Sequence, residues 1–122
     1  MTNMAELASL SDPALRRIEY LCEGEVSRRS EGGRDLVFMR GLRFYANGKN
    51  QKMDAVLCLN HSNPAYPTKL YLAERVEAGV NWHETAYLLG RQWHTFSWRD
   101  VRAEQPLIDI LAAHLSALNP HT

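Results

Sequence analysis

Apolar residues recur at intervals of three and four near both ends of the chain, and this spacing predicts a helix at each end. Asp12-Pro13 suits the start of the first helix, because aspartate caps a first turn and the N–H that proline lacks is unbonded there anyway. Gly24 suits its end. The apolar positions of this helix are Leu15, Ile18, Leu21 and Cys22. The second helix begins at Pro106 and ends at Asn119-Pro120. Its apolar stripe comprises Leu107, Ile108, Ile110, Leu111, Leu115 and Leu118.

Between these helices apolar residues alternate with polar ones, which is the pattern of half-buried strands. The predicted strands are Glu25–Arg29, Asp35–Phe44, Met53–Leu59 and Lys69–Ala73. Turn residues at 30–33 and 47–50 separate the first three strands, and Gly41 marks a bulge or a break in the second. The two prolines of 61–67 keep that segment out of a central strand, since proline donates no ladder hydrogen bond. The order predicts an antiparallel meander of four strands.

Residues 74–100 follow neither period. Glu77–Val80 and Gly90 indicate loops, and Trp82–Leu89 fits a short helix or a strand equally well. We therefore expect an irregular segment here. Helix, meander, loop and helix together predict a single α+β domain over residues 1–122, with residues 1–11 flexible and the helices packed on one sheet.

Composition narrows the classes of partner. Fourteen basic and fourteen acidic residues balance, so no basic face for nucleic acid is predicted. No apolar run approaches the roughly 20 residues that cross a bilayer, and the N-terminal residues lack the features of a signal peptide. We expect a cytoplasmic protein whose two cysteines, Cys22 and Cys58, are reduced thiols.

The five histidines show no metal-binding spacing. His83-Glu84 is followed by Thr85 and two further residues without a second histidine, so the zinc-protease pattern is incomplete. His114 lies on the apolar stripe of the last helix, where a buried or boundary histidine is expected. The sequence predicts no metal site and no cofactor.

The second half of the chain carries several landmarks in a fixed order. A turn, Asn63-Pro64-Ala65-Tyr66-Pro67, leads into the strand Lys69–Leu72; Gly90 then stands three residues before Trp93, and Trp98 precedes the last helix. This order resembles the core of the ubiquitin-conjugating (E2, UBC-like) enzymes. The resemblance implies a UBC-like fold with an N-terminal helix, a four-stranded antiparallel meander, an irregular active-site-like loop and a long C-terminal helix.

Two departures from that family bear on chemistry. Trp93 stands where the family has its nucleophilic cysteine. His83 lies near the place of the family's His-Pro-Asn motif, but Glu84 and Thr85 follow it, so the asparagine that supports the oxyanion is missing. The resemblance therefore implies a relative with no catalytic residue, an E2-like adaptor that binds a ubiquitin-like modifier or an E1-like or E2-like protein.

The segment Gly90–Trp98 is similar to a tryptophan-rich block in one branch of compact bacterial E2-like proteins. Those proteins come from operons with ubiquitin-like modifiers and E1-like and isopeptidase-like partners, so the resemblance implies a role in ubiquitin-like conjugation or antiviral defence. We expect the partner-binding residues to be Arg91, Trp93, His94 and Trp98 on one face, with the loop residues Asn63, Pro64 and Ala65 adjacent. Tryptophan and arginine dominate the energetics of many interfaces, although the same aromatic cluster would also serve as core packing.

Two alternatives remain open. The chain could be an active conjugating enzyme that uses a cysteine elsewhere, for which Cys58 is the runner-up nucleophile. Its apolar neighbours, Val56-Leu57 and Leu59, favour a buried structural thiol instead. The chain could also be a small α+β chaperone or interaction module unrelated to modifiers, since fold alone does not establish function.

Overall fold

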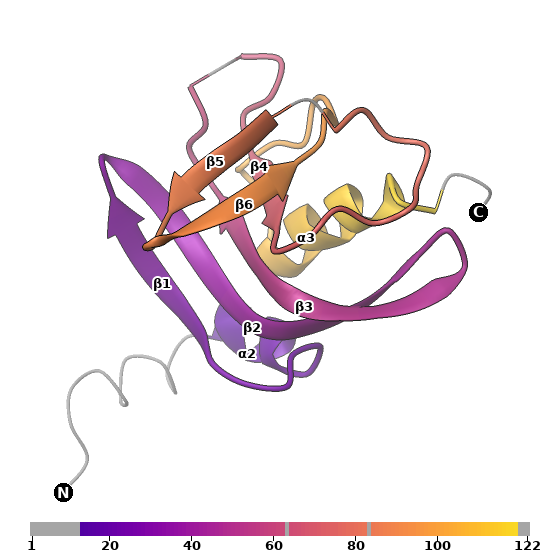
Figure 1. Cartoon of the computed structure of the whole chain (residues 1–122). Helices are drawn as coiled ribbons and strands as arrows, with labels where there is room; N and C mark the ends of the chain where they lie inside the picture. The colour runs from indigo at the N-terminus through magenta and orange to yellow at the C-terminus, as the bar shows by residue number, and fades with distance from the viewer. Residues whose placement is uncertain (1–12, 63, 83, 120–122) are drawn as a thin grey trace, which may run out of the picture.

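The computed structural model describes residues 13–62, 64–82 and 84–119. Within these residues the chain forms one six-stranded antiparallel sheet and two helices (Figure 1). The elements are α2 (Pro13–Glu19), β1 (Val26–Glu31), β2 (Arg34–Ala46), β3 (Lys49–Cys58), β4 (Lys69–Leu72), β5 (Glu84–Leu88), β6 (Arg91–Thr95) and α3 (Leu107–Ser116). The predicted α+β class is confirmed.

The strand order is β1-β2-β3-β4-β6-β5. Strands β1 to β4 form the predicted meander. The expectation of an irregular segment over 74–100 is wrong for residues 84–95, because β5 and β6 form a hairpin that joins the sheet beside β4, and it is confirmed for 74–82 and 96–100. Its turn is Leu89-Gly90, with φ of 53° and 79°, a pair of positive values typical of a two-residue hairpin loop.

The predicted turns and bulge are confirmed. Asn47-Gly48 connects β2 to β3 with φ of 52° and 76°. Gly41 has φ of 63°, and the register between β2 and β3 shifts between Met39 and Leu42. The bulge changes the alternation by one residue, so that Met39 and Leu42 both enter the same core.

Both helices are shorter than their apolar patterns. α2 ends at Glu19, and Cys22 lies beyond it in an isolated bridge with Leu42. α3 ends at Ser116, before the predicted stop at Asn119. The predicted cap Asp12, the flexible segment 1–11 and Pro120 lie outside the described residues.

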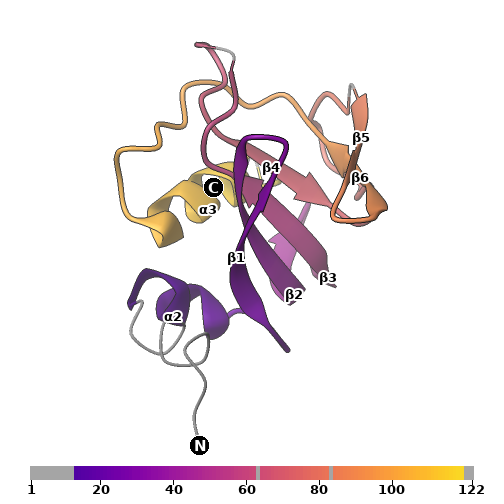
Figure 2. The ribbon, with the colours of Figure 1, turned by 90° about the vertical axis from the view of Figure 1, so that its left-hand side faces the viewer.

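Each face of the sheet is buried by its own cluster. Figure 2 shows α2 and α3 on one side of strands β1–β4 and the β5–β6 hairpin on the other. The helix-side core joins Leu15 and Ile18 of α2 and Ile110 and Leu111 of α3 to the sheet. The hairpin-side core comprises Leu36, Phe38, Val56, Cys58, Tyr71, Leu88 and Trp93. Both faces of β4 are therefore covered, and all four of its residues are buried.

Among the described residues, no helix has the length and apolar character needed to cross a membrane.

Candidate functional site

Trp93 lies at the centre of the hairpin-side core. Its side chain is fully buried, and its Nε1–H donates a hydrogen bond of 2.8 Å to the carbonyl of Leu88. The ring meets Phe38 edge to face, with centroids 6.4 Å apart, and the Arg91 guanidinium lies 4.4 Å from the ring centroid. The expectation that Trp93 offers apolar area to a partner is therefore wrong, and the alternative interpretation of this ring as core packing is confirmed. Alternation along β6 directs this side chain into the hairpin-side core.

Ionic and backbone contacts hold the hairpin over that core. The Glu31 carboxylate at the end of β1 accepts a hydrogen bond of 3.2 Å from the Leu89 N–H in the hairpin turn. Arg91 donates to Asp54 at 2.8 Å, and Asp54 also accepts the Gly41 N–H at 2.8 Å. Partial burial opposes ionisation of Asp54, but these two hydrogen bonds lower its pKa below the usual value.

The other end of the hairpin leads to an exposed surface. Trp98 is 41% exposed and follows β6 in an irregular segment. The Asp100 N–H donates to the Ala65 carbonyl at 2.9 Å, so the proline-containing loop lies beside this segment. An open groove of about 750 Å³ lies between them. Its lining residues are Pro64, Pro67, Asp100, Arg102 and Glu104.

The predicted binding residues thus separate into two places. Arg91 stands at the hairpin turn, whereas Trp98 lies past the far end of β6, on the order of 20 Å away for an extended strand. Ala65 and its neighbour Pro64 lie on the Trp98 side. The expectation of one common face is wrong for this reason. Asn63 lies outside the described residues.

His94 is half-buried between these two places. It pairs with Leu72 of β4 and Thr85 of β5 in the sheet register. Its Nδ1 is buried without a hydrogen-bond partner among the described residues. His94 follows Trp93 in β6, so the two side chains point to opposite faces of the sheet. Because Trp93 is buried, Trp98 is the exposed aromatic ring among the predicted binding residues.

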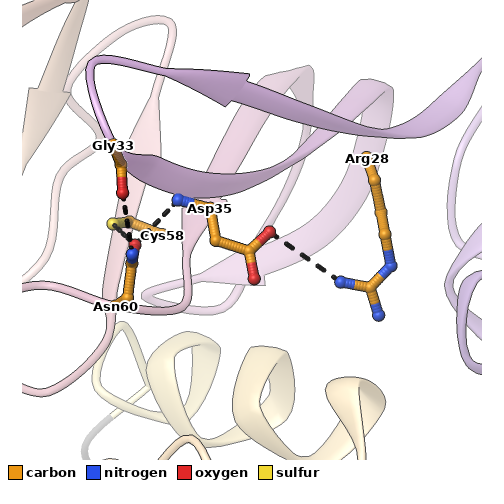
Figure 3. A network of polar contacts seen from close by, with 5 residues as sticks. All are labelled: Arg28, Gly33, Asp35, Cys58 and Asn60. Carbon is orange, nitrogen blue, oxygen red and sulfur yellow. Dashed lines mark hydrogen bonds and ion pairs between the residues drawn. The ribbon is translucent and has the colours of Figure 1, made fainter.

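Cys58 belongs to a structural network rather than to an exposed thiol site. Its side chain is 1% exposed, and burial raises the pKa of the thiol. Figure 3 shows Asn60 between Cys58, Asp35 and Gly33: its Oδ1 lies 3.7 Å from the Cys58 Sγ and accepts the Asp35 N–H at 2.7 Å, while its Nδ2 donates to the Gly33 carbonyl at 2.9 Å. These contacts fasten the end of β3 to the β1–β2 turn. A thiol in this setting stays protonated at neutral pH and is a poor nucleophile.

The other cysteine is in a similar state. Cys22 is 7% exposed, and burial raises the pKa of its thiol to about 11, against the opposing influence of Arg43. The expectation of buried thiols at both cysteines is confirmed.

Sequence reasoning missed a buried lysine beside the Tyr66-Pro67 turn. The Lys69 Nζ lies 3.7 Å from a Glu84 carboxylate oxygen and 5.3 Å from the centroid of the Tyr66 ring. The side chain is only 6% exposed, and burial lowers the pKa of the amine. Alternation along the predicted strand Lys69–Ala73 places Leu70 and Leu72 on one apolar side and Lys69 on the other. A second apolar face on the neighbouring strand, visible at Val56 and Cys58, was the signal that β4 is buried on both sides.

A buried polar contact anchors α3 beneath the exposed loop. The Thr68 hydroxyl donates to the Val101 carbonyl at 2.7 Å and lies 2.9 Å from the His114 Nε2, which therefore donates to it. His114 is 2% exposed, as predicted for the apolar stripe, and burial lowers its pKa to about 4. The ring is thus neutral at physiological pH.

In the part of the chain that the structure describes, no three histidine, cysteine, aspartate or glutamate side chains are grouped to hold a metal ion. No protein-family model, no curated protein and no solved structure matches this chain.

Proposed function

We propose that this chain is a non-catalytic, E2-like adaptor in a bacterial ubiquitin-like conjugation or antiviral defence system. It binds a ubiquitin-like modifier or an E1-like or E2-like protein without forming a thioester. The proposal rests on the sequence resemblance over 63–98, and one observation carries it: the residue at the nucleophile position, Trp93, is a buried and hydrogen-bonded core side chain.

The order of elements supports the UBC-like part of the proposal. A helix, a four-stranded meander and a closing helix occur in the expected sequence. The β5–β6 hairpin carries Gly90 and Trp93 in the segment where the family has its active-site loop. The indole of Trp93, packed against Phe38, occupies the position of the family's nucleophile and leaves no space for a thioester and an attacking amine.

The state of the two cysteines supports the absence of thioester chemistry. Cys58 and Cys22 are both buried, and burial raises the pKa of each thiol. A nucleophilic thiolate needs access and a lowered pKa, and both thiols have the opposite properties.

The proposed partner surface is the Trp98 end of the hairpin. Trp98 is a large ring that is 41% exposed, and the neighbouring groove presents Pro64 and Pro67 with charged residues at its border. The Asp100–Ala65 hydrogen bond keeps the two loops together. An exposed aromatic ring on a fixed loop is the kind of residue from which interface hot spots are built.

An experiment that measures both thioester formation and partner binding tests the proposal. Full-length protein is mixed with ATP and with the modifier and E1-like proteins encoded by the neighbouring genes. Non-reducing gels then report any adduct, and calorimetry reports binding. We expect no reducible adduct. We expect binding that Trp98→Ala weakens at least tenfold and that the control Tyr87→Ala leaves unchanged, because Tyr87 is also an exposed aromatic residue, 72% against 41% for Trp98, but lies on β5.

Two outcomes would overturn the proposal. A reducible adduct that disappears in Cys58→Ser identifies an active conjugating enzyme. Absence of a modifier or an E1-like or E2-like protein among the neighbouring gene products, or failure of all of them to bind, identifies an unrelated interaction module.

A further inference from the structure

Strand β5 forms one edge of the sheet, and its outer side is open. The strand order places it last, beside β6 alone (Figure 2). Among the described residues, no backbone hydrogen bond joins the outer side of β5 to another segment. Thr85 and Tyr87 are both exposed, and the contact of the hairpin with Glu31 of β1 lies past the end of β5, at Leu89. Another strand can therefore reach this edge.

The hairpin register shows which backbone groups of β5 point outward. In a two-residue hairpin loop, the residues that flank the loop exchange hydrogen bonds, and bonded pairs then alternate along the ladder. Leu88 and Arg91 flank the turn, so Leu88 and Ala86 bond to β6. The N–H and C=O groups of Thr85 and Tyr87 consequently point away from β6, toward the open side.

The middle of β5 lacks the charges that keep edge strands apart. Proteins commonly place charged side chains or proline on an exposed edge to prevent pairing with another chain. The opposite edge strand, β1, carries Arg28 and Arg29 at its middle. In contrast, β5 reads Glu-Thr-Ala-Tyr-Leu, and its threonine and tyrosine favour strand pairing. Its one charged residue, Glu84, stands at the first position and lies 3.7 Å from the Lys69 amine.

The sequence of β5 is complementary to itself in one antiparallel register. In this register Ala86 faces Ala86 of a second copy, and Thr85 faces Tyr87 of that copy. The outward N–H and C=O groups of both residues then meet as bonded pairs. Ala86 forms the non-bonded pair, where two backbones come closest and a small side chain fits. Glu84 faces Leu88, so no like charges of β5 oppose each other.

We propose that β5 pairs with β5 of a second copy of this chain, antiparallel about a two-fold axis at Ala86. The two sheets then continue across the interface of a dimer. A two-fold contact uses the same edge on both copies, so it closes and leaves no free β5 edge. This edge is separate from the Trp98 surface and does not depend on the proposed function.

Charge and rigidity support a second copy as the occupant. Fourteen basic and fourteen acidic residues balance, so two copies do not repel each other through net charge. The Tyr87 hydroxyl donates to the Gly90 carbonyl at 2.9 Å, which holds the ring in place before association. Pairing with Thr85 of the second copy therefore costs little side-chain entropy.

Sedimentation velocity over a dilution series of the full chain tests the proposal. We expect a wild-type dimer that dissociates on dilution. Thr85→Pro removes an N–H that β6 does not use, so the variant loses hydrogen bonds of the interface and keeps those of the hairpin. It should raise the dissociation constant by about tenfold or more. The matched control Thr85→Val keeps the N–H and the shape of the side chain, and should dimerise as the wild type does.

Cysteine cross-linking tests the register. Ala86→Cys places two thiols at the two-fold axis, where Cα atoms about 4.5 Å apart allow a disulfide. The control Gln92→Cys is also exposed but lies on β6, so its two copies are at least three strand spacings, about 14 Å, apart. Mild oxidation should link Ala86→Cys into a covalent dimer and leave Gln92→Cys unlinked. Cys22 and Cys58 are buried and should not compete.

Three results would overturn the inference. The first is a wild type that stays monomeric at every concentration, and the second is a dimer whose affinity Thr85→Pro leaves unchanged. The third is equal disulfide formation in Ala86→Cys and Gln92→Cys, which would place the contact outside β5. Thermal unfolding shows whether Thr85→Pro is folded, and the cross-linking pair decides the question if it is not.

Discussion

The two faces of the sheet are buried by different means. On the helix side, the apolar faces of α2 and α3 pack on the apolar face of the sheet, so the sequence pattern shows both partners of this core. On the hairpin side the sheet covers itself, because β5 and β6 fold across Leu36, Phe38 and Tyr71. Polar contacts such as Glu31–Leu89 and Arg91–Asp54 hold that cover in place. The helix-side core thus packs two helices on a sheet, whereas the hairpin-side core centres on Trp93, with Phe38 and Tyr71 beside it, and polar contacts at its edge hold the hairpin.

The difference is tested most strongly at the two tryptophans. Replacing Trp93 by alanine empties the centre of the hairpin-side core and leaves the Leu88 carbonyl without its donor. We expect a loss of about 3–5 kcal/mol in the free energy of unfolding, measured by urea titration, as for other large buried rings. Leu111→Ala in the helix-side core should fall in a similar range of about 2–5 kcal/mol.

Trp98→Ala is the matched control for Trp93→Ala. It removes the same side chain five residues along the chain, but from a half-exposed position, so its effect on stability should stay under about 1 kcal/mol. Equal losses for the two tryptophans would contradict the contrast between a core residue and a surface residue.

The helix-side core was the part that the sequence pattern could predict. Helical periodicity located both helices, and alternation located the meander, because each of these elements has one clearly apolar face. The Asn47-Gly48 turn and the Gly41 bulge were predictable from glycine placement.

The hairpin-side core was not predictable in the same way. β5 reads Glu-Thr-Ala-Tyr-Leu and β6 reads Arg-Gln-Trp-His-Thr, short strands with few apolar residues whose pairing partner is distant in the sequence. The local pattern therefore indicates a loop and leaves two interpretations of Trp93 open, a binding residue or core packing. The prediction of the binding site is affected most, because it places Arg91 and Trp98 on one face although strand β6 separates them.

Acid pH should weaken the helix-side core through His114. Burial lowers the pKa of this ring to about 4, below its ordinary value near 6.5, with a smaller influence from Lys69. The unfolded chain therefore binds a proton at a pH where the folded chain does not. The contribution of His114 to stability is fully present above pH 6.5 and is lost as the pH falls toward 4. The shift corresponds to roughly 3 kcal/mol at most.

The measurement is the pH dependence of the free energy of unfolding for the wild type and for His114→Gln. Carboxylates such as Asp54, whose pKa is lowered, also lose stabilising contacts in acid, so the difference between the two proteins isolates the histidine. Parallel curves between pH 6.5 and 4 would show that the ring is protonated without penalty.

Cys58 provides a smaller test on the hairpin side. Cys58→Ala removes a buried sulfur beside Tyr71 and frees Asn60 from one contact, so we expect a loss of about 1–2 kcal/mol. In the folded wild type, a thiol reagent at pH 8 should react with Cys58 only as fast as the protein opens. Rapid labelling with no change in unfolding free energy would instead mark an accessible thiol and revive the conjugating-enzyme alternative.

The smallest expected effect distinguishes the two cores most directly. Glu31→Gln keeps the shape of the side chain but removes the charge that accepts the Leu89 N–H, a partly exposed contact between β1 and the hairpin turn. The change in global stability should be about 0.5–1 kcal/mol, below the usual contribution of a hydrogen bond to a charged group, because water competes for this exposed contact. Hydrogen exchange gives the sharper readout, because local opening of a weakly tied element is measured separately from global unfolding. The Leu89 amide and the Trp93 indole N–H should exchange faster in Glu31→Gln, while amides of α3 such as that of Leu111 exchange at the wild-type rate. If the amides of α3 accelerate equally, the hairpin and the helices open as one cooperative unit, and the hairpin-side core is as firmly held as the helix-side core.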